Sequence, residues 1–112
     1  MPDATAYVAV MTTAGSIEEA RKIAAALVGA GKAACVQMAA IESCYAWDGA
    51  VRTEPERLLI VKTRRSLYPE VESMIRAFHS YATPEIVCLP IVAGSAAYLD
   101  WIASVTAAPG GA

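Results

Sequence analysis

The sequence predicts an α+β fold whose elements follow in the order β-α-β-β-α-β, with one more helix near the C-terminal end. Two observations predict it. Apolar residues switch along the chain between the period of two of a strand and the period of 3.6 of a helix. An Asp-Gly dipeptide, favoured in two-residue hairpins, interrupts a long apolar stretch. With 112 residues we expect a single domain over 1–112, ordered over about 5–106, with a flexible tail at 107–112.

The N-terminal part supplies a strand, a helix and the first arm of a hairpin. Residues 5–13 are rich in β-branched and apolar side chains and predict a strand. Ser16 and Glu19 have the spacing of a capping box, and apolar residues then recur at helical spacing as far as Gly31, which tolerates the positive φ of a helix end. The apolar run 33–47 ends at the Asp-Gly dipeptide, so it predicts a long strand that turns back into another.

The C-terminal part supplies the return strand, a helix, a strand and a last helix. The return strand starts at Ala50 and is dense in branched residues, but Pro55 cannot donate to a ladder, so we expect a bulge or an unpaired edge there. Helical spacing of apolar residues returns over 66–79. A strand over 85–92 and a short helix around 98–102 complete the order.

This order is the split βαβ arrangement of ferredoxin-like folds, an antiparallel sheet with both main helices on one face. The predicted hairpin strands are much longer than an average strand of about 5 to 6 residues. The second face of the sheet, together with this extended β-hairpin, has no predicted cover. Since an exposed hydrophobic sheet aggregates, we expect other copies of the chain to cover it, which makes the protein an obligate oligomer.

Composition excludes several classes of partner. A net charge of -2 leaves no basic field for nucleic acid. No stretch has the roughly 18 to 20 uncharged apolar residues of a membrane helix, because Pro90 and Gly94 break the longest candidate. Three cysteines without CxxC spacing, at least two of which we expect to be buried, and a start that has no basic region predict a cytoplasmic protein.

Three segments carry a family resemblance: "KAACVQ" (32–37), "SCYAWDG" (43–49) and "HSYATPEI" (79–86). Together they resemble the CutA divalent-cation tolerance proteins, and "LLIVKT" and "YLDWI" fit the same pattern. The resemblance runs from about Tyr7 to Ile102. It implies a homotrimer of ferredoxin-like subunits whose long strands pair across subunit edges, and a role in tolerance of copper and other divalent cations.

The sequence departs from this family pattern at two positions. Gln37 stands where the family usually has asparagine, and Ser80 stands where it usually has proline after the histidine. The first change could alter a hydrogen bond at a strand end, and the second could loosen the turn after His79.

The candidate metal ligands are Cys35, His79 and Glu85. Copper and zinc prefer thiolate and imidazole ligands, three or four of them converging on the ion. One chain supplies few: it has one histidine, and Cys35 and Cys44 are nine residues apart, so they face opposite sides of an unbulged strand. Symmetry-related copies would have to complete the site. We expect copper or another divalent cation as ligand, and no organic cofactor.

Each candidate ligand also has a structural interpretation. His79 lies where an imidazolium stabilises the last carbonyls of a helix. Cys35 has the character of a small buried hydrophobe. Glu85 could pair with Lys62 or Arg64, which is the interpretation that we favour.

A second predicted site is a ligand cleft between subunits. Lys62 ends an apolar strand, where a lysine either extends to the surface or meets a carboxylate, for which Glu56 and Glu85 are the candidates. The aromatic residues fit an interface better than a ligand cage. The residues assigned to the cleft are Trp47, Glu56, Lys62, Tyr81, Tyr98 and Trp101.

The sequence contains no nucleophile elbow, Walker loop, HExxH motif or paired-carboxylate signature, so we expect no enzyme and no catalytic residues. The main hypothesis is a cytoplasmic homotrimer that binds divalent cations weakly and acts in metal response or signalling. The alternative is a trimeric module that senses small molecules or binds a protein partner, with incidental metal binding.

Overall fold

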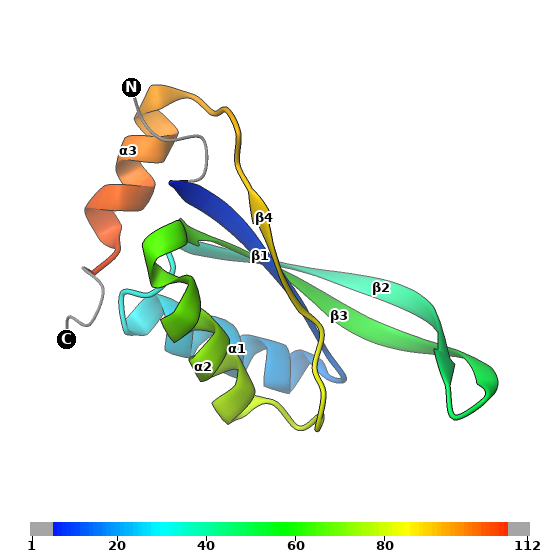
Figure 1. Ribbon diagram of the computed structural model, residues 1–112. Coiled ribbons are helices and arrows are strands. Elements are labelled where there is room, and N and C mark those ends of the chain that lie inside the picture. The colour runs from blue at the N-terminus through cyan, green and yellow to red at the C-terminus, as the bar shows by residue number, and fades with distance from the viewer. Residues whose placement is uncertain (1–5, 108–112) are drawn as a thin grey trace.

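The computed structural model describes residues 6–107 and contains one antiparallel sheet with strand order β2-β3-β1-β4 (Figure 1). Its strands are β1 (Tyr7–Ala14), β2 (Cys35–Trp47), β3 (Ala50–Arg64) and β4 (Ile86–Pro90). Its helices are α1 (Ile17–Gly29), α2 (Tyr68–Phe78) and α3 (Ala96–Val105), with a 3-10 turn at Arg65–Leu67. The predicted α+β order is confirmed. Apart from Ala107, the predicted flexible tail lies outside the described residues.

The start of α1 shows half of the predicted capping box. The Ser16 hydroxyl accepts a hydrogen bond from the Glu19 backbone N–H at 3.2 Å. The Glu19 carboxylate does not return to Ser16 and instead accepts from the Ser80 backbone N–H at 3.1 Å. At the other end the chain leaves α1 through Gly31, whose φ of 72° is the expected left-handed conformation.

The core lies between one face of the sheet and the helices α1 and α2. Alternate residues of the central strands point into it, because successive strand side chains point to opposite faces. Leu59 and Val61 of β3 are fully buried there beside Val8 and Val10 of β1. The helices contribute the apolar stripes that the sequence predicts, with Ile23, Leu27, Val71 and Ile75 at their centre.

The β2–β3 hairpin extends the sheet beyond the helices and gives the molecule its long axis of 47 Å (Figure 1). Asp48 and Gly49 form its turn with φ of 50° and 75°, as the Asp-Gly dipeptide predicts. Pro55 lies opposite Glu42 in an unbroken register, so the predicted bulge is absent. The pairing of β1 with β3 ends at Arg57, which leaves Pro55 on the unpaired edge that was the other expectation.

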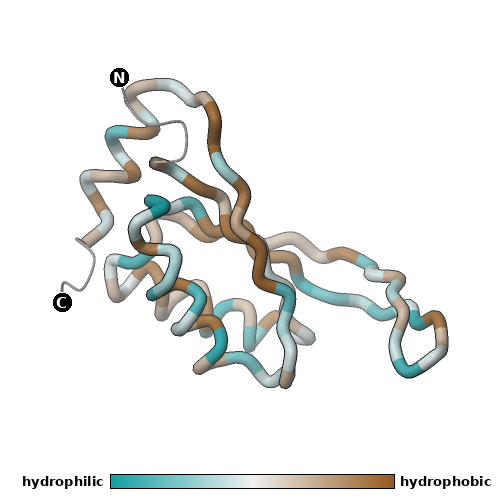
Figure 2. Tube along the Cα trace, in the orientation of Figure 1, coloured by the Kyte–Doolittle hydropathy of each residue, from teal (hydrophilic) through white to brown (hydrophobic). Residues whose placement is uncertain are grey.

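The outer face of the sheet, which points away from α1 and α2, is apolar and open. It carries Met11 of β1, Leu58 and Ile60 of β3, and Val87 and Leu89 of β4, as the register places them. Val87 and Leu89 are 45% and 47% exposed. Figure 2 shows the hydrophobic colour along β4, whereas the part of β3 that extends beyond the helices is mostly hydrophilic. The prediction that the chain leaves one apolar face of its sheet uncovered is confirmed.

Helix α3 is held at the end of the sheet opposite the hairpin. Arg64 donates hydrogen bonds to the Thr106 hydroxyl at 2.9 Å and to the backbone carbonyls of Thr106 and Ala107. Ile102 is the fully buried residue of this helix. Among residues 6–107, the helices are all too short or too polar to span a bilayer.

Candidate functional site

His79 follows α2 directly and connects that helix end to β1. The partners of its ring identify the tautomer. Nε2 lies 2.5 Å from the Thr13 carbonyl oxygen, which only accepts, so Nε2 carries the proton. Nδ1 lies 3.0 Å from the Tyr81 backbone N–H, which only donates, so Nδ1 is the acceptor. The side chain is completely buried.

This geometry leaves His79 without a free lone pair for a metal ion. A metal ligand needs an unprotonated ring nitrogen, and both nitrogens are engaged by the backbone. The expectation that the ring stabilises the last carbonyls of α2 is wrong, because its proton is directed at β1. In this structure His79 is a structural link, and its assignment as a metal ligand is not supported by its geometry.

The loop after His79 lies against the start of α1. One carboxylate oxygen of Glu19 accepts from Ser80, and the other is buried, lies 3.8 Å from Nδ1 of His79 and has no hydrogen-bond partner. A proline at position 80 would lack the N–H that Ser80 donates. The departure from the family pattern at Ser80 therefore adds a contact rather than loosening the turn.

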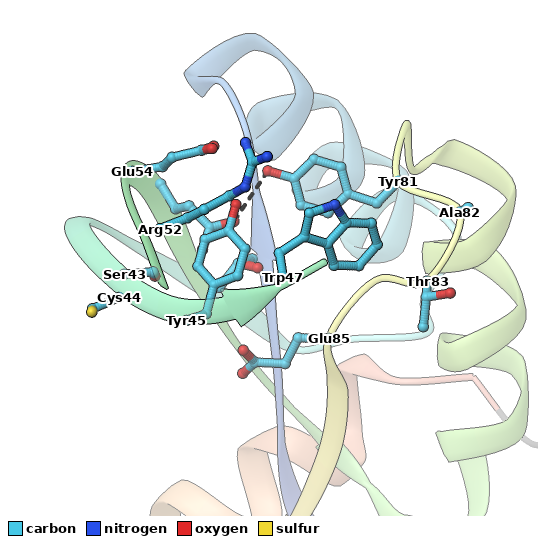
Figure 3. Close-up of a pocket in the computed structure, with 12 residues that line it drawn as sticks. Ser43, Cys44, Tyr45, Trp47, Arg52, Glu54, Tyr81, Ala82, Thr83 and Glu85 are labelled. Atoms are coloured by element: carbon cyan, nitrogen blue, oxygen red, sulfur yellow. Dashed lines mark hydrogen bonds between the residues drawn. The ribbon is translucent and has the colours of Figure 1, made fainter. Parts of the chain in front are cut away.

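A cavity of about 690 Å³ lies between the hairpin and the loop over 79–85. Figure 3 shows Trp47 and Tyr45 of β2 beside Tyr81 of the loop, with Glu85 below them. Glu56 of β3 also lines the cavity and accepts a hydrogen bond from the Tyr81 hydroxyl at 3.1 Å. The structure thus brings together three of the six residues predicted for the ligand cleft, Trp47, Glu56 and Tyr81.

The tyrosines of this cavity are held in their protonated form. The pKa of Tyr81 is raised to about 12, first by burial and then by the hydrogen bond to Glu56 and the charges of Glu56, Glu19 and Glu54. The pKa of Tyr45 is also raised, by desolvation and then by Glu54. Both hydroxyls therefore keep their protons further into alkaline solution than an ordinary tyrosine does.

The other three predicted cleft residues form a separate cluster near α3. Lys62 donates to the side-chain oxygen of Gln37 at 3.1 Å, and its ammonium lies 5.8 Å from the centre of the Tyr98 ring. Tyr98 and Trp101 are neighbours, with ring centroids 5.6 Å apart. Gln37, the other departure from the family pattern, thus contacts the lysine.

The predicted pairing of Lys62 with Glu56 does not occur within the chain. The two residues are six positions apart on the straight strand β3, a separation of roughly 20 Å. Glu85 lines the cavity at the hairpin instead, and Arg64 is engaged by Thr106. The residues predicted for one cleft therefore form two separate clusters in the described chain.

The predicted metal ligands are also apart. Cys35 pairs with Lys62 in the sheet, whereas Thr13, the partner of His79, pairs with Leu58. Leu58 and Lys62 are four positions apart on β3, a distance of roughly 13 Å along the strand. Within residues 6–107, no three side chains of His, Cys, Asp or Glu form a group that could hold a metal ion.

The cysteines are less buried than expected. Cys44 is exposed because it lies in the part of the hairpin that has no helix over it, and Cys35 and Cys88 are half-buried. Burial raises the pKa of the Cys88 thiol, although Arg65 counteracts the effect. Cys35 is half-buried on the outer face, opposite Lys62 in the sheet.

Residues 8–105 match the family described as CutA1 divalent ion tolerance protein. The chain belongs to this family. It is 45% identical over 94 residues to the divalent-cation tolerance protein CutA of Thermus thermophilus, an alignment that covers 83% of the chain and 91% of the relative. It is 40% identical over 100 residues to the chloroplastic protein CutA of Arabidopsis thaliana. That alignment covers 88% of the chain but 55% of the plant protein, so the chain spans about half of its length.

Solved CutA structures have the same fold. The CutA1 structure from Thermus thermophilus has a TM-score of 0.87 and 42% identity, covering 90% of the chain and 99% of that structure. The CutA structure from Synechococcus elongatus has a TM-score of 0.88 and 36% identity, covering 92% of each chain. The resemblance that the sequence motifs carry is therefore confirmed at the level of family and fold.

Several residues of the cavity were missed by sequence reasoning. Tyr45, Arg52 and Glu54 line the cavity, and none of them was assigned to a site. Tyr45 and Arg52 are partners in the hairpin register, and Ser43 and Glu54 are the next pair along the same face. Alternation along a hairpin with a fixed turn could have placed all of them on one face.

Proposed function

We propose that the protein acts as a homotrimer in the response to divalent cations, copper foremost, and binds these ions weakly between subunits. The single observation that carries the proposal is the open apolar outer face of the sheet. Leaving this face in water is unfavourable, at roughly 25 cal/mol for each Å² of apolar surface. Three copies is the number that the resemblance to CutA proteins implies.

The long hairpin supports an assembly of this kind. Strand β2 is an edge strand, and the backbone groups along its free side can pair with a strand of another chain. Its first residue, Cys35, lies on the outer face and is half-buried. Since residues 6–107 of one chain do not gather a metal site, copies of Cys35 at subunit boundaries are the soft ligands that we propose for copper.

Two further properties belong to the proposal. We propose a cytoplasmic protein, because the three cysteines are unpaired thiols, as a reducing compartment allows. We propose that it is not an enzyme, because the chain's imidazole is occupied on both nitrogens and is not available as a general base.

The oligomer is tested by light scattering, with the mass of one chain being 11.7 kDa. We expect the mass of three chains for the native protein and a smaller mass for Ile60→Glu, which places a charge on the outer face. Glu42→Gln on the exposed hairpin is the matched control and should keep the native mass. A single chain in dilute buffer for the native protein would contradict the proposal.

Metal binding is tested by titrating the metal-free protein with copper under anaerobic conditions. We expect saturable binding that Cys35→Ser weakens at least about tenfold, because thiolate is the preferred soft ligand. Cys88→Ser, which changes a half-buried thiol on the helix side of the sheet, is the control. Binding that is absent, or unchanged in Cys35→Ser, would remove the metal role.

A second candidate function is a trimeric module that senses a small molecule. The observation that favours it is the cavity of about 690 Å³ at the base of the hairpin, a volume within the usual range of ligand pockets. A thermal-shift screen of metals, organic cations and organic anions separates the two candidates. A shift with metals alone would favour the first function, and a shift with an organic compound would favour the second.

A further inference from the structure

A buried cluster of His79, Glu19 and Tyr81 lies where the loop over 79–85 meets the start of α1. The His79 side chain is completely buried by its own chain, so these contacts do not depend on what lies against the outer face of the sheet. Histidine is the residue type whose charge ordinarily changes between about pH 5 and 8. The chain has one histidine, so a histidine signal in this range comes from this ring.

The neutral ring holds Tyr81 in two ways. Nδ1 accepts a hydrogen bond from the Tyr81 backbone N–H at 3.0 Å, while Nε2 donates to the Thr13 carbonyl. The phenol ring of Tyr81 packs against the imidazole, with ring centroids 4.6 Å apart. The uncharged His79 therefore fixes both the backbone and the side chain of Tyr81.

A second proton on the ring has to enter at Nδ1, because Nε2 already carries one. The new Nδ1–H would face the Tyr81 N–H, and since both groups only donate, the hydrogen bond between them would be lost. Oε2 of Glu19 provides another acceptor. It is buried, lies 3.8 Å from Nδ1 and has no hydrogen-bond partner among residues 6–107. A closure of about 1 Å would bring the two atoms to the roughly 2.8 Å of a charge-assisted hydrogen bond.

The strands and the loop around the ring offer groups of other kinds. β1 contributes the Thr13 carbonyl, and the loop contributes Tyr81, whose hydroxyl donates to Glu56 of β3 at 3.1 Å. The pKa of Tyr81 is raised to about 12, so this hydroxyl keeps its proton throughout the range in which histidine titrates. Arg57, the neighbour of Glu56, lies on β3, the strand beyond β1.

The cations of the two adjacent helices have partners of their own. Lys22 of α1 lies 5.6 Å from the centre of the Phe78 ring, and Arg76 of α2 donates to Glu72 at 3.0 Å. Within the described residues, the ion-pair partner of the imidazole is thus Glu19.

We propose that His79 is a proton-operated switch for the loop over 79–85. The neutral ring holds the Tyr81 N–H, whereas the imidazolium, formed by one proton taken up from solvent, donates its Nδ1–H to the Glu19 carboxylate and releases Tyr81. The other oxygen of Glu19 accepts from the Ser80 N–H, so the released part of the loop begins after Ser80. Because the Tyr81 hydroxyl is bonded to Glu56, the change extends from the start of α1 to the hairpin.

The test is a pH titration of the isotope-labelled full chain by nuclear magnetic resonance. As the pH falls from about 8 to 5, we expect Nδ1 of His79 to gain a proton while the chain stays folded. The protection of the Tyr81 amide against hydrogen exchange should fall about five- to tenfold with the same midpoint, because this amide loses its acceptor. The Ser80 amide should keep its protection. An Nδ1 that gains no proton, or a Tyr81 amide whose protection does not follow the ring, would overturn the proposal.

Two matched variants separate the Glu19 contact from the general charge of the helix start. Glu19→Gln retains an oxygen for the Ser80 N–H but removes the negative charge, so the midpoint should move to lower pH by about one unit. Glu18→Gln removes the same charge from the neighbouring exposed position and should leave the midpoint unchanged. Equal shifts in the two variants would overturn the proposal. If Glu19→Gln does not fold, the titration of the native chain still decides it.

His79→Gln separates the ring from every other titrating group. The amide side chain has no proton to gain in this range, so the protection of the Tyr81 amide should be the same at both ends of the titration. A loss that persists in His79→Gln would assign the effect to another group and overturn the proposal. The switch does not rest on copper or on a small molecule, and its failure would leave both candidate functions intact.

Discussion

The two faces of the sheet differ although the same strands form both. Leu59 points toward α1 and α2 and is fully buried, whereas Leu58, the preceding residue, points to the outer face and is half-buried. Helices α1 and α2 cover one face, whereas α3 reaches the other face only at the end of the sheet, beside Lys62 and Arg64. The first face is thus filled within one chain, whereas the second stays apolar and partly exposed, which is the face that the proposed assembly would cover.

The largest effect is expected from this pair of leucines. Leu59→Ala should lower the free energy of unfolding by about 2 to 5 kcal/mol, because it removes a fully buried side chain and leaves a cavity. The cost should not depend on protein concentration. Leu58→Ala should instead weaken assembly, so that its cost grows as the protein is diluted. Denaturant titration at several concentrations measures both.

An equal loss of unfolding free energy in Leu59→Ala and Leu58→Ala at every protein concentration would contradict this difference between the two faces. Leu58 would then be covered within its own chain, and the outer face would have no role in assembly.

The next effect concerns the loop over 79–85, which connects α2 to β4. His79→Ala should lower the free energy of unfolding by about 1 to 3 kcal/mol, because the Thr13 carbonyl loses its buried donor. Ser80→Ala retains the backbone N–H that Glu19 accepts, and it should be nearly neutral. Thermal unfolding of both variants measures the difference. A neutral His79→Ala would show that the imidazole is not the link between α2 and β1.

A smaller effect is expected from Ser80→Pro, which removes the N–H donated to Glu19. His79 has φ of -85° and ψ of 139°, a conformation that a following proline accepts. The lost hydrogen bond destabilises the folded chain, whereas proline stabilises it by lowering the entropy of the unfolded chain. The net change in the free energy of unfolding should therefore be within about 1 kcal/mol. Denaturant titration against Ser80→Ala measures it, and a loss well above that range would mean that Glu19 depends on this donor.

The last effect is confined to alkaline solution. Tyr81 has its pKa raised from 10.0 to about 12 in the folded chain. The unfolded chain therefore loses this proton first, and the stability present below pH 10 falls as the pH rises toward about 12. Glu56→Gln should make this fall smaller, because it removes the negative partner of the hydroxyl.

Unfolding at roughly pH 9 and pH 11 measures the alkaline effect, and Glu42→Gln is the control. The same alkaline loss in Glu56→Gln as in the native chain would show that the Glu56 contact does not hold the Tyr81 proton.

Local patterns predicted most of the fold. Helical spacing, the capping serine, Gly31 and the Asp-Gly turn each act within a few residues, and the structure places them as expected. The open outer face was also predicted, because both main helices of this arrangement lie on one face of the sheet and leave the other without a helix.

The candidate site was predicted less well, because its residues come from distant parts of the chain. Glu56 and Lys62 are close in sequence, but a straight strand keeps them apart. Glu19 and Ser80 are far apart in sequence and form a hydrogen bond because α1 and the loop meet in space. The roles of His79 depended on two backbone partners that no spacing rule identifies.

The contact of Arg64 with Thr106 and Ala107 has a practical consequence for handling the protein. It fixes the departure point of residue 107 at the end of the molecule remote from the hairpin turn (Figure 1). An affinity tag or fluorescent reporter fused after that residue would begin far from Trp47 and the cavity beside it. Surface immobilisation through such a fusion would attach the chain at the end opposite the hairpin turn.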